Sequence, residues 1–404
     1  MPDSTAAGLP LIVSVDDHVF EPPDLWSARL PARYRDSGPR VVREVSGAAA
    51  DPRADRVPVD VWCYEDVRIP LNSSFAAAGK GAAEVDGTPI TFDAIRPGCY
   101  EVTARLADMD LDGVEASLCF PNMFVRFCGQ RFLEARDKKL AKLCVEIYND
   151  WAIEEWAGAS AGRLLASPIV PLWDVDLARA EVFRNAARGV TSVCFSEIPA
   201  KLGLPSMYSG YWEPLFAACA ETETVINLHI GSSSTTNKTS PDAPFIIHTS
   251  NHYGNSSLSL SDWLMSGVFL RHPTLKVAFS EGQAGWIPYL MSRLDGIWRA
   301  GNAFMGGDAL PDPPSSYLAE HVYACVFDDP AILRFLDDGP LPLDNICFET
   351  DYPHPDGSWP NSRASAQAQT RTLSAEDQLK VLRLNAARLY RMERITADAA
   401  EPAR

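Results

Sequence analysis

Short apolar stretches alternate with longer amphipathic segments along most of the chain. The apolar stretches are rich in Val, Ile, Leu and Phe, as is typical of parallel strands that are buried on both faces. The eight strand candidates are Leu11–Asp16, Ala116–Phe120, Leu164–Val170, Ser192–Phe195, Val225–Ile230, Lys276–Ser280, Val322–Phe327 and Asn345–Thr350. The helical candidates lie at about 101–113, 134–158, 175–188, 211–222, 258–271, 284–300, 329–337 and 374–392.

This alternation predicts an α/β protein in which a strand and a helix follow one another repeatedly. Eight such units favour a closed (β/α)8 TIM barrel over an open doubly wound sheet. The last helix has a clear start, because Ser374 can cap it and Asp377 follows at the capping-box position. In a TIM barrel the chemistry lies where the strands end, so functional residues are expected at the carboxyl ends of the eight candidates.

Two regions fall outside the repeat. Residues 38–100 follow the first strand, and we interpret them as an insertion, mostly loop with room for a hairpin, that covers the barrel mouth. Residues 231–256 are rich in Ser, Thr and Asn and form a long loop after the fifth strand, where such loops usually cover a small-molecule site. We therefore expect a single domain over residues 1–395 and a flexible tail at 396–404.

The composition narrows the class of protein. With 46% hydrophobic and 22% charged residues the chain can bury a core, which excludes wholesale disorder. Its formal net charge of −17 argues against binding to nucleic-acid phosphates or to an anionic membrane surface. No apolar run approaches the ~20 residues that span a bilayer, and residues 1–10 show no export signal. The nine cysteines form no CxxC pair, so we expect a reduced, cytoplasmic protein without a structural zinc module.

Three strand ends carry residue types that bind metals. The first strand leads into Asp16 and His18, whose spacing puts both side chains on one face of an extended segment. The fifth strand ends near His229, and the eighth leads into Asp351, whose burial is costly unless it is paired or bound to a metal. Each signal alone also fits a structural role. Together they place two imidazoles and two carboxylates at one rim, a set that suits Zn²⁺ or Mn²⁺ and can serve Fe²⁺ or Co²⁺.

In these motifs the sequence resembles the amidohydrolase superfamily, specifically the amidohydrolase-related (amidohydrolase 2) branch that includes aminocarboxymuconate-semialdehyde decarboxylase and γ-resorcylate decarboxylase. The matching stretches are Ser14–Pro23, Arg105–Asn122, Tyr148–Trp151, Asn227–Ser232, Gly267–Lys276, Gly285–Asp295, Glu349–Pro355 and Asn385–Tyr390. They cover nearly the whole chain outside 38–100. The resemblance implies a TIM barrel of the metal-dependent hydrolase type and leaves the substrate open.

The resemblance also implies roles for single residues. Asp16 and His18 would take the two ligand positions of strand one, and His229 and Asp351 those of strands five and eight. The fourth strand ends without the lysine of binuclear relatives, so one divalent metal is expected, with zinc as the first choice and manganese as the alternative. One position departs from the pattern, because Glu281 stands where the decarboxylases place a catalytic histidine after strand six. A carboxylate there could act as a general base or bind a cationic substrate group.

The function that the resemblance implies is metal-dependent decarboxylation of a small carboxylated aromatic or related acid, a C–C cleavage without water. Asp351 would transfer the proton to carbon, with Glu281 and His354 as further catalytic residues and with Asn227 and Glu21 as substrate contacts. The alternative is a metal-dependent hydrolase in which an activated water attacks an amide, lactone or ester. A barrel that only binds a ligand is disfavoured, because all four ligand positions hold competent residue types. We expect a small-molecule substrate, no nucleic-acid or membrane partner, and a homo-oligomer, a dimer.

Overall fold

The computed structural model describes residues 8–45, 57–301, 304, 310–334 and 339–400. All eight predicted strands are present within a few residues of their expected bounds. They are β1 (Ile12–Val19), β5 (Val114–Pro121), β6 (Leu164–Ala166), β7 (Ser192–Ser196), β8 (Val225–His229), β9 (Val277–Ser280), β10 (Val322–Val326) and β11 (Ile346–Phe348). Every pairing among them is parallel.

The eight strands close into a ring. They pair in chain order within two sheets, β1-β5-β6 and β7-β8-β9-β10-β11. At one seam the backbone N–H of Asp351, just past β11, donates to the carbonyl of Asp16 in β1 at 2.8 Å. At the other seam the N–H of Cys194 in β7 donates to the carbonyl of Pro168, just past β6, at 2.8 Å. The predicted (β/α)8 barrel is therefore confirmed, and the carboxyl ends of its strands share one rim.

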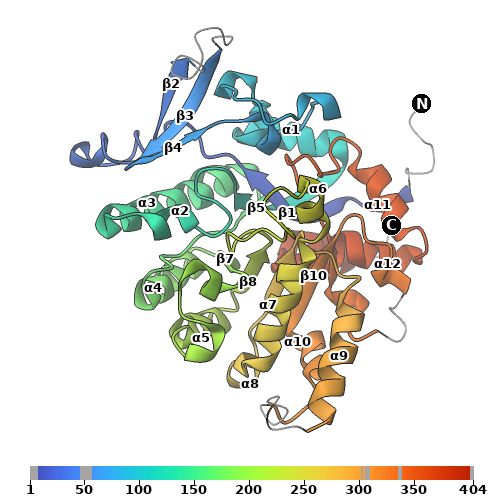
Figure 1. Cartoon of the computed structure of the whole chain (residues 1–404). Coiled ribbons are helices and arrows are strands. Elements are labelled where there is room, and N and C mark those ends of the chain that lie inside the picture. Colours follow the sequence, from blue (N-terminus) through green and yellow to red (C-terminus); the bar gives the residue numbers. More distant parts are fainter. Residues whose placement is uncertain (1–7, 46–56, 302–303, 305–309, 335–338, 401–404) are drawn as a thin grey trace.

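The helices lie around the strands in chain order (Figure 1). They are α1 (Val102–Asp112), α2 (Gln130–Glu134), α3 (Lys138–Trp151), α4 (Val175–Ala186), α5 (Glu213–Glu221), α6 (Phe245–Ser250), α7 (Tyr253–Met265), α8 (Val268–Arg271), α9 (Ile287–Arg299), α10 (Leu318–His321), α11 (Ser362–Thr370), α12 (Ala375–Leu379), α13 (Asn385–Leu389) and α14 (Glu393–Ala400). Asp137 and Asp174 begin α3 and α4 by accepting hydrogen bonds from first-turn amides. Ser374 caps α12 in the same way, as predicted.

Some elements differ from their predictions. The helix expected at 329–337 is, in its described part, a single 3-10 turn at Ile332–Arg334. Asp329 explains this, because its carboxylate accepts the amide of Ala284 at 2.8 Å and holds the segment on the neighbouring loop. The helix expected at 258–271 begins earlier and divides into α7 and α8 at Gly267, whose φ is positive. The described part of the predicted tail, 396–400, belongs to α14.

The insertion at 38–100 is more regular than expected. It contains a three-stranded antiparallel sheet, β2 (Arg40–Val45), β3 (Pro58–Tyr64) and β4 (Val67–Pro70), which projects from one side of the barrel (Figure 1). Trp62 stacks on Phe124, a residue that follows β5, with ring centroids 4.8 Å apart. The later part of the insertion reaches the mouth, where the amides of Ala77 and Ala78 donate to the carbonyl of Pro353. The sheet therefore flanks the mouth, and the segment after it covers part of the rim.

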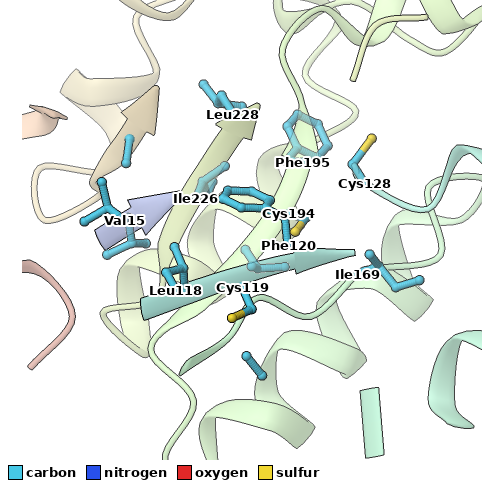
Figure 2. Close-up of a cluster of buried hydrophobic side chains, with 14 of the residues drawn as sticks. Val15, Leu118, Cys119, Phe120, Cys128, Ile169, Cys194, Phe195, Ile226 and Leu228 are labelled. Atoms are coloured by element: carbon cyan, nitrogen blue, oxygen red, sulfur yellow. The ribbon is translucent and has the colours of Figure 1, made fainter. Parts of the chain in front are cut away.

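A continuous cluster of buried apolar side chains links the strands to the surrounding helices and runs from Ile12 to Ile395. Figure 2 shows part of it, with Val15, Leu118 and Ile226 from three strands directed toward one another. All nine cysteines are free and buried, as expected of small apolar side chains in a core. Within the described ranges, no helix has the length and apolar character needed to cross a membrane. The single domain expected over residues 1–395 stays a prediction.

A fully buried arginine fixes the end of β1. Arg105 of α1 donates through Nε to the carbonyl of Gly98 at 2.7 Å and through Nη2 to the carbonyl of His18. Its guanidinium lies 4.1 Å from the ring centroid of Tyr352, and its Nη1 lies 3.9 Å from Oδ2 of Asp17. Arg105 thus joins α1, the end of β1 and the loop after β11 directly behind the rim.

We predict that Arg105→Lys lowers the free energy of unfolding by about 3 kcal/mol, because lysine cannot reproduce the forked contacts and leaves buried carbonyls without donors. Guanidinium denaturation followed by circular dichroism measures this loss. The matched control is Arg299→Lys at the exposed end of α9, which should stay within ~0.5 kcal/mol of the wild type. Equal stability of the two variants would show that the buried guanidinium does not support the rim.

Candidate metal centre

The structure brings Asp16, His18, His229 and Asp351 together at the rim, although they come from β1, β8 and the end of β11. Nε2 of His18 lies 3.5 Å from Oδ1 of Asp16 and 3.2 Å from Oδ1 of Asp351. Nε2 of His229 lies 3.3 Å from Oδ2 of Asp16. All four side chains are buried, so solvent does not separate them.

Hydrogen bonds on the far side of each imidazole fix which nitrogen faces the cluster. Nδ1 of His18 lies 3.4 Å from the carbonyl of Pro121, and Nδ1 of His229 lies 2.6 Å from the carbonyl of Ile230. A carbonyl only accepts, so Nδ1 carries the hydrogen in each ring and Nε2 presents a lone pair. Burial lowers the pKa of both histidines well below the usual value, which keeps the rings neutral. The two Nε2 atoms are 3.2 Å apart, an approach that a shared cation would stabilise.

The Asp16 carboxylate would also be stabilised by a cation. Neither of its oxygens accepts a hydrogen bond from any described residue, although the side chain is fully buried. Burial, reinforced by the charges of Glu349 and Asp351, raises the pKa of Asp16 well above its ordinary value. A buried carboxylate without a donor is costly unless a cation compensates it. The ligand atoms of Asp16, His18 and His229 lie within 4.8 Å of one another, so this donor set fits a divalent metal that prefers nitrogen and oxygen ligands.

His354 is in direct contact with Asp351. Its Nδ1 lies 2.9 Å from Oδ1 of Asp351, and its Nε2 lies 3.5 Å from Oδ1 of Asn122. Burial alone would lower the pKa of His354, but the carboxylates of Asp351 and Asp356 outweigh it and raise that pKa. A protonated His354 can donate from both nitrogens, which matches its two acceptors. Of the residues predicted to be catalytic, Asp351 and His354 are therefore in direct contact.

Glu281 also lies at the cluster, directly after β9. Its Oε2 is 3.4 Å from Nε2 of His229. Its backbone has a φ of 60°, a left-handed conformation that is uncommon outside glycine and that often marks functional sites. Its amide donates to Oε2 of Glu349 at 3.1 Å, which holds the turn in place. Burial and the charges of nearby carboxylates, with Asp351 the first of these, raise the pKa of Glu281 well above its ordinary value.

The two predicted substrate contacts, Glu21 and Asn227, both make hydrogen bonds within the fold. Glu21 is fully buried, and its carboxylate accepts the amides of Phe124 at 3.3 Å and Val125 at 3.1 Å. Asn227 accepts a hydrogen bond from the Tyr390 hydroxyl at 2.6 Å through its Oδ1. These contacts favour structural roles for both residues, because each polar group is already engaged with the scaffold.

Sequence reasoning missed two residues of the site. Phe127 stacks on His229 with ring centroids 4.1 Å apart and an interplanar angle of 12°, and its edge meets His18. Nothing in the sequence distinguished it from other aromatic residues in loops. Asp356 lies close to Glu281 and Asp351, with carboxylate oxygens within 4.8 Å of one another. Its position soon after Asp351 in the loop that follows strand eight was a usable signal.

A cavity of about 840 Å³ opens beside the cluster. Its acidic lining residues are Glu281, Asp328, Asp329 and Asp356, and its aromatic ones are Tyr253, Trp286, Tyr289 and Phe327. A cavity of this size, lined by both aromatic and polar side chains, can hold a small organic molecule.

Comparisons with known proteins agree with the architecture. Residues 94–392 match the model of the amidohydrolase family. A solved amidohydrolase from Mycobacterium avium subsp. paratuberculosis K-10 shares 21% identity and a TM-score of 0.72, over 94% of this chain and 99% of that one. A 2,6-dihydroxybenzoate decarboxylase from Rhizobium shares 18% identity and a TM-score of 0.58, over 95% of this chain and 100% of that one. A 5-carboxyvanillate decarboxylase from Novosphingobium aromaticivorans, solved with bound manganese, shares 15% identity and a TM-score of 0.65, over 96% of this chain and 98% of that one. At these identities the likeness shows a shared fold.

We predict about one divalent transition metal per chain in the purified protein, measured by inductively coupled plasma mass spectrometry. His229→Ala should weaken metal binding by about 100-fold or more, because it removes a ligand and not merely its support. The control is His272→Ala, since His272 pairs with Glu213 away from the rim. Full metal retention in His229→Ala would contradict the assignment.

We also predict that the metal-free protein loses stability as pH rises. Burial raises the pKa of Glu349 to about 8, so the folded state holds this proton more tightly than the unfolded chain does. That contribution is fully present below the unfolded pKa near 4.5 and is lost as pH approaches 8. Chemical denaturation of Glu349→Gln should therefore show a loss about 3 kcal/mol smaller between pH 5 and pH 8. The exposed Glu101→Gln should follow the wild type, and parallel curves for all three proteins would refute the burial argument.

Proposed function

The chain belongs to the amidohydrolase family, and from that premise we propose that it is a metal-dependent decarboxylase of a small carboxylated aromatic acid. The family match confirms the predicted superfamily and, at that level, an enzyme that is a metal-dependent carboxy-lyase or hydrolase. The observation that carries the choice of lyase is the contact between Asp351 and His354 at 2.9 Å. Decarboxylation needs a group that delivers a proton to carbon, whereas hydrolysis needs one that removes a proton from water.

In this proposal Asp16, His18, His229 and Asp351 hold one divalent metal. When bound, the metal supplies Lewis-acid polarisation of the substrate carboxylate and a fixed point for orienting it. The bond between the ring carbon and the carboxylate carbon breaks, CO₂ leaves, and the electron pair stays on the ring carbon. Asp351 passes to that carbon a proton that it receives from Nδ1 of His354. His354 then recovers its proton from solvent.

The walls of the site support a reaction without water. Phe127 stacks on His229 and meets the rings of His18 and His354 edge-on. Asp351 is itself fully buried and lies beside the fully buried His18, so bulk water has little access to it. The aromatic residues of the adjoining cavity suit a planar ring.

The finer assignments remain part of this proposal. Two of the compared structures are decarboxylases of aromatic acids, and one of them contains manganese, which supports an aromatic acid as substrate and manganese as the alternative metal. Zinc is our first choice, because two imidazoles and two carboxylates suit it. The cytoplasmic location and the homodimer expected from the sequence also stay predictions.

One observation favours hydrolysis as a second candidate. Glu281 lies beside the cluster as a carboxylate, with its Oε2 3.4 Å from Nε2 of His229. In that position it could accept a proton from a water that attacks an amide, lactone or ester. The two candidates differ in whether an oxygen atom from water enters the product.

We predict that incubation with a panel of hydroxybenzoates, lactones and amides in ¹⁸O-water gives CO₂ from a ring acid without ¹⁸O in the aromatic product. Asp351→Asn should lower kcat about 100-fold or more, because it removes the proton donor. Metal content and circular dichroism of the variant are measured in parallel, and the exposed Asp24→Asn serves as the control. Label from water in a product carboxylate would establish the hydrolase instead.

A further inference from the structure

The cavity beside the metal centre offers many hydrogen-bond acceptors and little positive charge. Among the described residues that line it, none is a lysine or an arginine. Glu281 and Asp356 both line it, and so does Gln283, whose buried Oε1 has no donor in the part of the chain that the structure describes. His252 is on the wall as well, but burial lowers its pKa to about 4, so it adds no charge at neutral pH.

Glu281 is the deepest of these acceptors. Its side chain is 10% exposed, and the nitrogen next to it is Nε2 of His229 at 3.4 Å. That nitrogen presents a lone pair, since the hydrogen of the ring lies on Nδ1 toward Ile230. The His229 ring therefore offers no hydrogen to this carboxylate, although the side chain is nine-tenths buried. Such a group calls for a donor or a cation from outside the chain.

Carboxyl groups continue from the metal centre into the cavity. One side-chain oxygen each of Glu281, Asp351 and Asp356 lies within 4.8 Å of the others. Of these three residues, Glu281 and the exposed Asp356 also line the cavity, so two acceptors stand close together on its wall.

Part of the cavity wall is aromatic. Trp286, Tyr253 and Phe327 line it. Nε1 of Trp286 donates to the carbonyl of Gly282 at 2.8 Å, which holds the indole against the turn that contains Glu281. Aromatic faces attract cations and also pack against the ring of an organic ligand. This wall favours an organic cation over a second metal ion, which would need further oxygen or nitrogen ligands.

We propose that the substrate carries an ammonium group in addition to its carboxylate, and that this group binds between Glu281 and Asp356. The inference rests on the proposed function for the carboxylate and adds a second, cationic subsite on the cavity side. An ammonium donates in three directions and accepts in none, which matches a wall of acceptors. Hydrogen bonds between an ammonium and a carboxylate are also among the stronger ones in proteins. A second anionic group on the substrate would be repelled.

The test compares two ligands of the same shape and different charge. Benzylamine, which is protonated at neutral pH, and benzyl alcohol are titrated into the metal-loaded protein by isothermal calorimetry. We expect benzylamine to bind at least about tenfold more tightly, with a smaller ratio at high salt. Neither probe has a carboxylate, so the result does not depend on decarboxylation. Equal affinities, or tighter binding of the alcohol, would overturn the proposal.

Variants locate the subsite. Asp356→Asn and Glu281→Gln should each reduce the preference for benzylamine several-fold and leave benzyl alcohol unchanged, whereas the exposed Asp24→Asn should keep the full ratio. Metal content is measured in each protein, and Asp356→Asn keeps the test valid if Glu281→Gln loses metal. A second metal ion per chain that disappears in Asp356→Asn would refute the ammonium subsite. A preserved benzylamine preference in a protein that releases no CO₂ would refute only the proposed function.

Discussion

The rim of the barrel is organised by one electrostatic conflict. Two imidazole nitrogens with their lone pairs inward stand 3.2 Å apart, and the Asp16 carboxylate beside them receives no hydrogen bond from the described residues. Two neutral imidazoles and an ionised carboxylate in this arrangement are unfavourable in a buried site without a cation. A cation resolves the conflict, and the scaffold must hold the groups against their mutual repulsion until it binds.

The neighbouring carboxylate shows how the scaffold does so. Asp17 is also fully buried, yet its Oδ1 accepts from the hydroxyls of Ser14 at 3.0 Å and Thr350 at 2.5 Å, and its Oδ2 accepts from Ser117 at 2.5 Å. Adjacent residues of one strand therefore have opposite surroundings. Asp17 is saturated with donors and ties β1 to β5 and to the end of β11, whereas Asp16 is left to the cluster. The contacts of Asp17 thus join β1, β5 and the end of β11 directly beside the cluster.

The sequence was sufficient for the strands and for the convergence of the four candidate ligands, because both follow from local pattern and from barrel closure. Apolar runs predict buried parallel strands, and the i, i+2 relation to His18 is what distinguishes Asp16 from Asp17. The sequence did not predict contacts between segments that lack a local periodicity. Phe127 lies in a loop and stacks on the candidate ligand His229. The carboxylate of Glu21 accepts hydrogen bonds from backbone amides far along the chain. Such roles depend on which atoms meet after folding, and no residue type indicates them in advance.

The same logic connects the metal centre to the cavity. Carboxylates that repel one another across a buried rim make the site selective for positive charge, first for a metal and then for whatever the cavity admits. Glu281 lies at the boundary of both, since one side of its carboxylate faces His229 and the cavity lies on the other. A histidine at this position would add a donor and remove a charge. The carboxylate instead extends the acidic field of the metal centre into the cavity, so that the chemistry of the ligand and the identity of this residue are linked.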